Sequence, residues 1–386
     1  MARKRLLIVT HTFLPHVGGI ERVVYEQGKR LMLLGFDVSV LTSRMNTPQS
    51  YMIDGIKVYC YDSLNAAFGL GIPYPIPQVS CFEPFYKLVN QSDLVHVHGH
   101  PYLSSLYAVK LARFLGKPVV LTQHNTFIAY ESALWDHVEW WNDATVGKQV
   151  IRSSDRIITV SSATREYVLS LGADYQRTKV LRNGVDVDRF KPSNASGNSV
   201  RKKLGINPGV IVILTVRRLV YKNGIDTLIE SACLALQKDP KLVFLAAGKG
   251  PDRDAIQARI QQLGISNNFK LAGFVSDADL PAYYNAADVF ILPSKSGEGL
   301  PLVALEAMST GLPVIATDVG GIAEIMADGY GKLVPAGDAE EMSEAILQLN
   351  RMDLSPVKSA VRSVAESTFS WEANVKRLAE TYEELI

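Results

Sequence analysis

The chain has few cysteines and no long apolar run. Its 386 residues include three cysteines, Cys60, Cys81 and Cys233, which are widely spaced and belong to no C-x-x-C or Cys/His cluster. An odd, scattered set of this kind predicts reduced thiols in a cytosolic compartment. The apolar part of the opening MARKRLLIVT is too short for a signal peptide or a spanning helix, and no other segment reaches spanning length. We therefore expect a cytoplasmic protein, and contact with a membrane surface stays open.

The chain also lacks an excess of charge of either sign. Lys and Arg number 40 against 39 Asp and Glu, a net charge of +1. Nothing in this balance favours nucleic acid as the main partner. A hydrophobic content of 47% with 20% charged residues is typical of soluble globular proteins. A chain of this length predicts about two domains.

Two common ligand signatures are missing. Neither the Gly18-Gly19 loop nor GKG at 248–250 fits the G-x-G-x-x-G fingerprint of dinucleotide-binding folds. The histidines of VHVHGH, at 96, 98 and 100, alternate and so share one face of a strand or its exit. No carboxylate or cysteine is spaced to complete a metal site with them. We therefore expect no metal and no dinucleotide cofactor.

What the sequence does contain is a regular alternation of short β-branched runs and helical patterns. This alternation predicts an α/β protein made of βαβ units, with parallel sheets covered by helices on both faces. The expected strands are RLLIVT, DVSVLT, IKVYCY, LVHVHG, PVVLTQ, RIITVS and TKVLRN in the first half, and VIVILTV, KLVFLAAG, FKLAGF, DVFILP, PVIATD and GKLVPA in the second.

A change of composition divides the chain. The polar segment KPSNASGNSVRKK, 191–203, has the composition of a linker. We expect two doubly wound domains, 1–190 and 204–369, joined by it. The last segment, 370–386, is an amphipathic helix with Trp371, Val375, Leu378 and Tyr382 at helical spacing. Spacing alone leaves open which domain this helix packs against.

The most informative stretch is SKSGEGLPLVALEAM, 294–308, which holds Glu298 and Glu306 eight residues apart. The run before it predicts a buried strand, and LVALEAMSTG predicts a helix ended by Gly311. Glu298 then lies in the loop and Glu306 about one turn inside the helix, with Pro301 in the first helical turn.

The free N–H groups at that helix start favour an anion between the two acids. An anion site flanked by two carboxylates suits a diphosphate between two hydroxyl-bearing rings, which is the shape of a nucleotide sugar.

Other residues of the expected site lie at the ends of other strands. In VRRLVYKNGIDTLIE, 216–230, the cations Arg218 and Lys222 could neutralise a diphosphate, whereas Arg217 is expected to point away. Gly18 and Gly19 follow the first strand, where glycine allows a phosphate to approach the backbone. His124 also ends a strand. The pair Gly320-Gly321 serves either backbone approach or a tight connection.

These motifs together resemble the retaining glycosyltransferases of family 4. The pair Glu298 and Glu306 matches the family's E-x7-E motif, and Gly299, Leu300, Pro301 and Leu302 stand where the family has a run close to G-F-G-L. The resemblance implies the GT-B fold, in which two Rossmann-like domains face a central cleft and a last helix crosses back to the first domain. It implies that Glu298 contacts hydroxyls of the donor sugar and that Glu306 accepts hydrogen bonds from the ribose.

The resemblance extends to the other strand ends. Arg218 and Lys222 fall in a stretch like the family's R-L-x-x-K-G, which holds the diphosphate, with Asn223 as a one-residue variation. Gly18 and Gly19 fall in its G-G-x-E-R loop. The family often has a histidine near the donor sugar at the place of His124. No metal is implied, because no D-x-D motif stands in an active-site loop and cationic side chains can replace the ion.

The activity implied is transfer of a sugar, with retention, from a UDP-, GDP- or ADP-sugar to a hydroxyl of a glycan, lipid-linked or small-molecule acceptor. The alternatives are a nucleotide-sugar epimerase or hydrolase of the same fold and a non-catalytic sugar-binding protein. The aromatic segments 64–86 and 125–142 fit no regular pattern. They are candidates for the acceptor site or membrane contact, or they form local cores.

Overall fold

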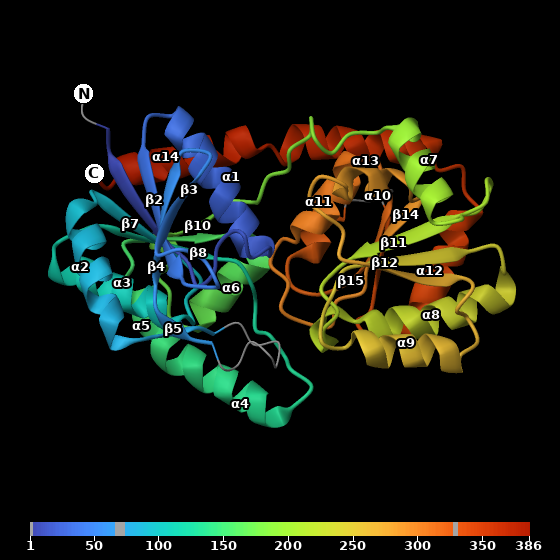
Figure 1. Ribbon diagram of the computed structural model, residues 1–386, viewed down its shortest axis with the longest axis horizontal. Coiled ribbons are helices and arrows are strands. Elements are labelled where there is room, and N and C mark those ends of the chain that lie inside the picture. Colours follow the sequence, from blue (N-terminus) through green and yellow to red (C-terminus); the bar gives the residue numbers. More distant parts are fainter. Residues whose placement is uncertain (1–2, 66–73, 327–330) are drawn as a thin grey trace. The chain divides into compact units, whose positions relative to one another are not determined.

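The computed structural model describes residues 3–65, 74–326 and 331–386, and the chain forms two compact units. Unit 1 consists of Met1–Phe127, Ser132–Asn183 and Trp371–Ile386, and unit 2 of Ile128–Glu131 and Gly184–Ser370. Figure 1 follows the chain through both. Within the described ranges, no helix is both long and apolar enough to cross a membrane.

Unit 1 is built on an eight-stranded sheet of order β10-β9-β8-β7-β1-β2-β4-β3. All neighbours pair in parallel except β3, which is antiparallel to β4. Its strands are β1 (Arg5–Val9), β2 (Asp37–Ser43), β3 (Ser50–Ile53), β4 (Ile56–Tyr61), β7 (Leu94–His98), β8 (Val119–Gln123), β9 (Arg156–Thr159) and β10 (Thr178–Val180); β5 (Ser63–Leu64) and β6 (Ile76–Pro77) form a separate small sheet.

Helices cover both faces of this sheet because alternate strand residues are apolar on both sides. Leu6 and Ile8 of β1 face one core, and Leu7 and Val9 face the other. The helical elements are α1 (Gly19–Leu33), η2 (Val79–Cys81), α2 (Phe82–Gln91), α3 (Leu103–Phe114), α4 (Ala133–Asn142), the π-helical η3 (Asp143–Gly147), α5 (Lys148–Ser153), α6 (Ser162–Ser170), η4 (Tyr175–Arg177) and α14 (Trp371–Glu383).

Helix α14 belongs to unit 1 and lies beside α1, as the red and blue helices of Figure 1 show. Val375 and Leu378 join the core of Leu6 and Ile8. The Arg30 Nε atom donates to a carboxylate oxygen of Glu372 at 3.0 Å. The amphipathic helix expected at 370–386 is therefore packed on the sheet formed by the first part of the chain.

Unit 2 is built on a six-stranded, fully parallel sheet of order β13-β12-β11-β14-β15-β16. One of its cores joins strand side chains to α8, α9 and α12. The strands are β11 (Val212–Val216), β12 (Val243–Ala247), β13 (Phe269–Gly273), β14 (Val289–Leu292), β15 (Val314–Thr317) and β16 (Gly331–Val334). The helical elements are α7 (Asn194–Lys203), η5 (Tyr221–Asn223), α8 (Ile225–Lys238), α9 (Arg253–Gln262), α10 (Leu280–Asn285), α11 (Leu302–Ser309), η6 (Ile322–Ile325), α12 (Ala339–Asn350) and α13 (Ser355–Thr368).

The segment 191–203 differs from the linker expected from its composition. Residues Asn194–Lys203 form α7, and Gly197 lies so close to the Asn285 carbonyl of α10 that a side chain there would overlap it. Arg201 pairs with Asp288 at 2.6 Å. Packing within unit 2 stabilises this helix, and composition does not report such packing.

The aromatic segments also contain regular structure that was not expected. Helix α2 begins at Phe82, inside the segment 64–86, and ends at Gln91. Helix α4 occupies most of the second half of 125–142. Residues 66–73 of the first segment lie outside the described residues.

Candidate active site

The loop between β14 and α11 carries Glu298, and α11 carries Glu306. Both residues are only 7% exposed. Pro301 is the N-cap of α11, one residue before the helical turn in which it was expected. Leu300 is a buried residue of this loop, and Leu302 is the first helical residue.

The helix α11 ends as its sequence predicts. Gly311 has a φ of +81°, and its N–H donates to the Met308 carbonyl at 2.9 Å. The next N–H, of Leu312, donates to the Ala307 carbonyl at 3.0 Å. These bonds form a Schellman motif, which fixes the length of the helix and so the position of Glu306 on it.

Glu298 is held by Arg217, a residue that was wrongly expected to point away. The Arg217 Nη2 atom lies 2.5 Å from Glu298 Oε1, and its Nη1 donates to the Ser294 hydroxyl. Ser294 in turn donates to Glu298 Oε1 at 3.0 Å. Burial by itself would raise the pKa of the Glu298 carboxyl, but the charges of Arg217 and Lys222 outweigh burial and lower it.

The end of β11 explains the direction of the Arg217 side chain. The Arg217 N–H continues the strand ladder to Ala247 at 2.9 Å. Its Nη2 also donates to Asn223 Oδ1 at 2.8 Å, and the Asn223 amide donates to the Arg218 carbonyl. Asn223 is buried at the end of η5, so the β11–α8 loop folds around the guanidinium.

Glu306 is held by a buried tyrosine. The Tyr284 hydroxyl donates to Glu306 Oε2 at 2.8 Å and also lies 3.2 Å from the Val303 carbonyl oxygen. Burial and the neighbouring Glu306 charge raise the pKa of Tyr284 well above its ordinary value. Tyr284 therefore stays a hydrogen-bond donor that orients this carboxylate.

Arg218 and Lys222 lie in the β11–α8 loop, as their sequence positions predict. Arg218 is exposed, whereas Lys222 is partly buried on η5 and its charge acts on Glu298. The structure thus places Arg218, Lys222, Glu298 and Glu306 at loops and a helix of unit 2 that follow the carboxyl ends of β11 and β14.

Gly18 and Gly19 begin α1 in unit 1, with Gly18 as the N-cap. A side chain at Gly18 would overlap the Glu21 carboxylate, whereas a Cβ at Gly19 would meet nothing within 4 Å. The buried Glu21 also accepts a hydrogen bond from Thr12. The Glu21 carboxylate therefore lies next to Gly18 at the start of α1, whereas the space beside Gly19 is open.

His124 belongs to a buried cluster of imidazoles in unit 1. His98 Nδ1 lies 2.8 Å from His124 Nε2, and His96 lies 2.6 Å from the Tyr382 hydroxyl and 2.7 Å from that of Thr122. Burial lowers the pKa of His11, His96 and His124 to about 3, and that of His98 well below its ordinary value. These four imidazoles, His11, His96, His98 and His124, are called the histidine cluster below, and they are neutral near pH 7.

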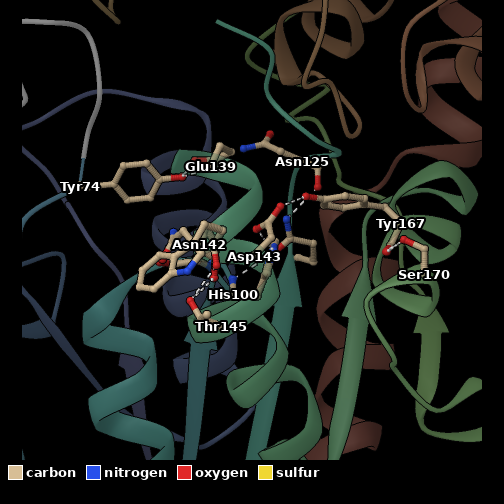
Figure 2. Close-up of polar contacts among 12 residues, drawn as sticks. Tyr74, His100, Asn125, Glu139, Asn142, Asp143, Thr145, Tyr167 and Ser170 are labelled. Carbon is tan, nitrogen blue, oxygen red and sulfur yellow. Dashed lines mark hydrogen bonds and ion pairs between the residues drawn. The ribbon is translucent and has the colours of Figure 1, made fainter. Parts of the chain in front are cut away.

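His100 is part of a separate network, shown in Figure 2. Its Nε2 lies 2.7 Å from Asp143 Oδ1 and its Nδ1 lies 2.7 Å from Gln123 Oε1, while Tyr167 donates to Asp143. Asp143 opens the π-helical turn η3, and π turns often occur at functional sites. Near it, the Tyr74 hydroxyl bonds both carboxylate oxygens of Glu139 at 2.8 and 2.7 Å. The His100 network fixes the end of α4 against β8.

The three alternating histidines therefore have different partners. Across the described part of the chain, no three His, Cys, Asp or Glu residues are grouped so that they could hold a metal ion. Sequence reasoning missed Arg217, Tyr284 and Ser294. The one available signal was the charge of Arg217 beside Arg218, since a Tyr or a Ser that borders an apolar run is usually structural.

Two family models match the chain. The model described as "Glycosyl transferases group 1" matches residues 198–362, and "Glycosyltransferase Family 4" matches residues 17–189. Each match falls almost wholly within one unit.

Curated relatives match over most of their length. A D-inositol 3-phosphate glycosyltransferase of Geodermatophilus obscurus is 30% identical, over 95% of this chain and 84% of the relative. A GDP-mannose-dependent monoacylated alpha-(1-6)-phosphatidylinositol monomannoside mannosyltransferase of Corynebacterium glutamicum is 26% identical, over 98% of this chain and 97% of the relative.

A solved structure shows the same fold. HepE of Anabaena, in complex with UDP and glucose, superposes with a TM-score of 0.83 at 21% sequence identity, over 99% of this chain and 100% of that one. This likeness confirms the α/β fold with two Rossmann-like domains of the GT-B type. The central cleft between the domains stays a prediction. The chain therefore belongs to the group 1, family 4 glycosyltransferases, retaining enzymes of the GT-B fold that transfer a sugar from a nucleotide-sugar donor.

Proposed function

We propose that unit 2 binds the donor with Glu298 at its sugar and Glu306 at its ribose. The observation that carries this assignment is a pair of nearly buried carboxylates, each with one oxygen already fixed by a neighbour. An ionised carboxylate only accepts hydrogen bonds, so it suits hydroxyl groups, which donate. Carboxyl ends of parallel strands are where ligands bind in sheets of this kind.

Arg218 and Lys222 then neutralise the diphosphate, which gains negative charge as the glycosidic bond breaks. Preorganised cations stabilise such developing charge more than they stabilise the bound substrate. The α11 start, with Leu300, Pro301 and Leu302, would contribute backbone N–H groups, although Pro301 has none to give. In unit 1, Gly19 offers the open backbone of the α1 start, and His124 is a neutral imidazole that can accept or donate one hydrogen bond.

The nucleotide and the acceptor are narrower proposals. One relative depends on GDP-mannose, and the HepE structure holds UDP and glucose, so a UDP- or GDP-sugar is the first donor to test. The relatives are named for an inositol phosphate and for a phosphatidylinositol mannoside. A polyol, free or lipid-linked, is therefore the first acceptor class to test. A cytoplasmic location at or near a membrane surface also stays a prediction.

A thermal-shift screen tests the donor assignment. UDP-glucose, GDP-mannose and ADP-glucose are each compared with the corresponding free nucleoside diphosphate. A ligand at a hundred times its Kd stabilises the folded protein by about 2.7 kcal/mol. The best donor is then incubated with inositol 3-phosphate or with phosphatidylinositol vesicles, and products are resolved by mass spectrometry. Sugar release or isomerisation that no acceptor diverts would indicate the hydrolase or epimerase instead. No shift with any nucleotide sugar would contradict the proposed site.

A further inference from the structure

Arg217 is in direct contact with the carboxylate assigned to the donor sugar. Its guanidinium bonds three groups, the Glu298 carboxylate, the Ser294 hydroxyl and the Asn223 amide oxygen. The side chains of Arg217 and Glu298 are 8% and 9% exposed. Both ions of this pair are nearly desolvated, so each needs the other.

We propose that Arg217 is a positioning residue of the donor site, which holds Glu298 in one orientation for the sugar hydroxyls. This proposal rests on the donor assignment above. A glutamate in a loop has rotamer freedom that it must lose when it binds. Arg217 and Ser294 both bond Oε1, so they remove that freedom before the donor arrives. Preorganisation of this kind raises affinity without any new ligand contact, because less conformational entropy is lost on binding.

The backbone around the pair supports the same role. Gly320 has a φ of +57°, and a Cβ there would overlap the Glu298 carbonyl oxygen. Thr317 of β15 donates to the Ser294 carbonyl at 2.6 Å. Main chain and side chain of the Glu298 loop are therefore fixed from separate strands. A point charge could neutralise Glu298, but only a planar fork bonds Glu298, Ser294 and Asn223 together.

The test separates the sugar from the nucleotide. Arg217→Met removes the charge, Arg217→Lys keeps it without the fork, and Glu298→Gln removes the partner's charge. Arg253→Met is the matched control, because Arg253 is an exposed arginine of the same unit that pairs with Asp254. Calorimetry measures Kd for UDP and UDP-glucose, or for GDP and GDP-mannose if the guanine pair binds better in the screen. Transfer assays add kcat and KM, and the acidic limb of kcat/KM is recorded.

We expect Arg217→Met to weaken the binding of UDP-glucose by about ten- to a hundredfold and the binding of UDP by less than about threefold. Arg217→Lys should fall between Met and the parent. The acidic limb should move to higher pH in Arg217→Met, because the pKa of Glu298 rises when this cation is lost. If Arg217 had a purely structural role, its loss would weaken the binding of UDP and of UDP-glucose alike. The acidic limb of the kcat/KM profile would then stay in place.

A double variant keeps the test decisive if Arg217→Met folds poorly. Arg217→Met/Glu298→Gln buries no unpaired charge, so it should melt nearer the parent than Arg217→Met does. If Arg217 acts through Glu298, the double variant loses no more UDP-glucose affinity than the worse single variant. Losses that multiply, or UDP-glucose binding by Arg217→Met within twofold of the parent, would overturn the proposal. If Glu298→Gln itself binds UDP-glucose like the parent, the donor assignment fails instead.

Discussion

The two carboxylates of unit 2 are oriented by different chemistry. Glu298 has an ionic partner, whereas Glu306 accepts a hydrogen bond from a tyrosine with a raised pKa. A tyrosine that stays neutral orients Glu306 without itself neutralising the carboxylate, and a carboxylate suits a hydroxyl pair such as that of ribose. This difference gives the two acids separable effects on ligands.

Glu306→Ala should weaken the binding of the free nucleoside diphosphate by about ten- to a hundredfold, because charge-assisted hydrogen bonds contribute about 1.5–3 kcal/mol. Calorimetry with UDP or GDP measures the loss. Glu340→Ala, at an exposed glutamate in the first turn of α12, is the matched control. Unchanged affinity in a folded Glu306→Ala protein would remove the ribose assignment.

Glu298→Gln should instead lower turnover while the free diphosphate binds nearly as in the parent, because the diphosphate lacks the sugar. The measurement is the affinity of Glu298→Gln and of Glu306→Ala for the same free nucleoside diphosphate. Equal losses of diphosphate affinity would contradict separate sugar and ribose roles.

At the scale of elements, the sequence predicted the parallel strands of both units because each is a short β-branched run between helical patterns. It missed β3, although Asp54 and Gly55, with φ of +47° and +86°, form a two-residue hairpin of a kind that the D-G pair often marks. It missed α7 because packing rather than composition stabilises that helix. The carboxylates of the site were predictable from spacing within one segment.

Their partners were not predictable in the same way. Arg217 meets Glu298 because the neighbouring strands β11 and β14 end at one edge of the sheet. Tyr284 meets Glu306 because α10 and α11, which precede and follow β14, bring the two side chains together. No local pattern encodes such contacts between distant residues. The sequence therefore predicted that Glu298 lies in a loop and Glu306 on a helix, and the fold shows which residues contact them.

Gly320→Ala tests the close approach of the β15–η6 loop to the Glu298 loop. A methyl group there meets both a left-handed backbone and the Glu298 carbonyl, so we expect a loss of stability above the strain of about 1–2 kcal/mol alone. Gly264→Ala is the control, since Gly264 has a similar φ of +69° and open space around its Cβ. Denaturant unfolding of both variants gives the difference, and equal losses would mean that the contact relaxes freely.

At the scale of the whole molecule, the histidine cluster couples stability to pH. Each of its imidazoles is protonated in the unfolded chain below about pH 6.5 but stays neutral when folded, down to about pH 3 for His11, His96 and His124. The unfolded state then binds more protons, so the free energy of unfolding falls as pH falls below 6.5.

Urea unfolding at pH 7, 6 and 5 should show this decline. His11→Phe keeps a ring against Tyr102, with which His11 stacks at 3.9 Å, and should reduce the slope by up to about 1.4 kcal/mol per pH unit. His137→Gln, at an exposed histidine of α4, serves as the control. A slope that His11→Phe leaves unchanged would mean that the buried imidazole takes up its proton in the folded state.

The return of α14 to unit 1 has a consequence for how the chain is made. Tyr382 bonds a histidine 286 residues earlier, and α14 completes the apolar face of a sheet whose strands all precede residue 181. During translation the ribosome must finish all of unit 2 before that face can be covered. Nascent unit 1 therefore keeps this apolar surface exposed while unit 2 is being made, and transiently exposed surface of this kind is prone to aggregation.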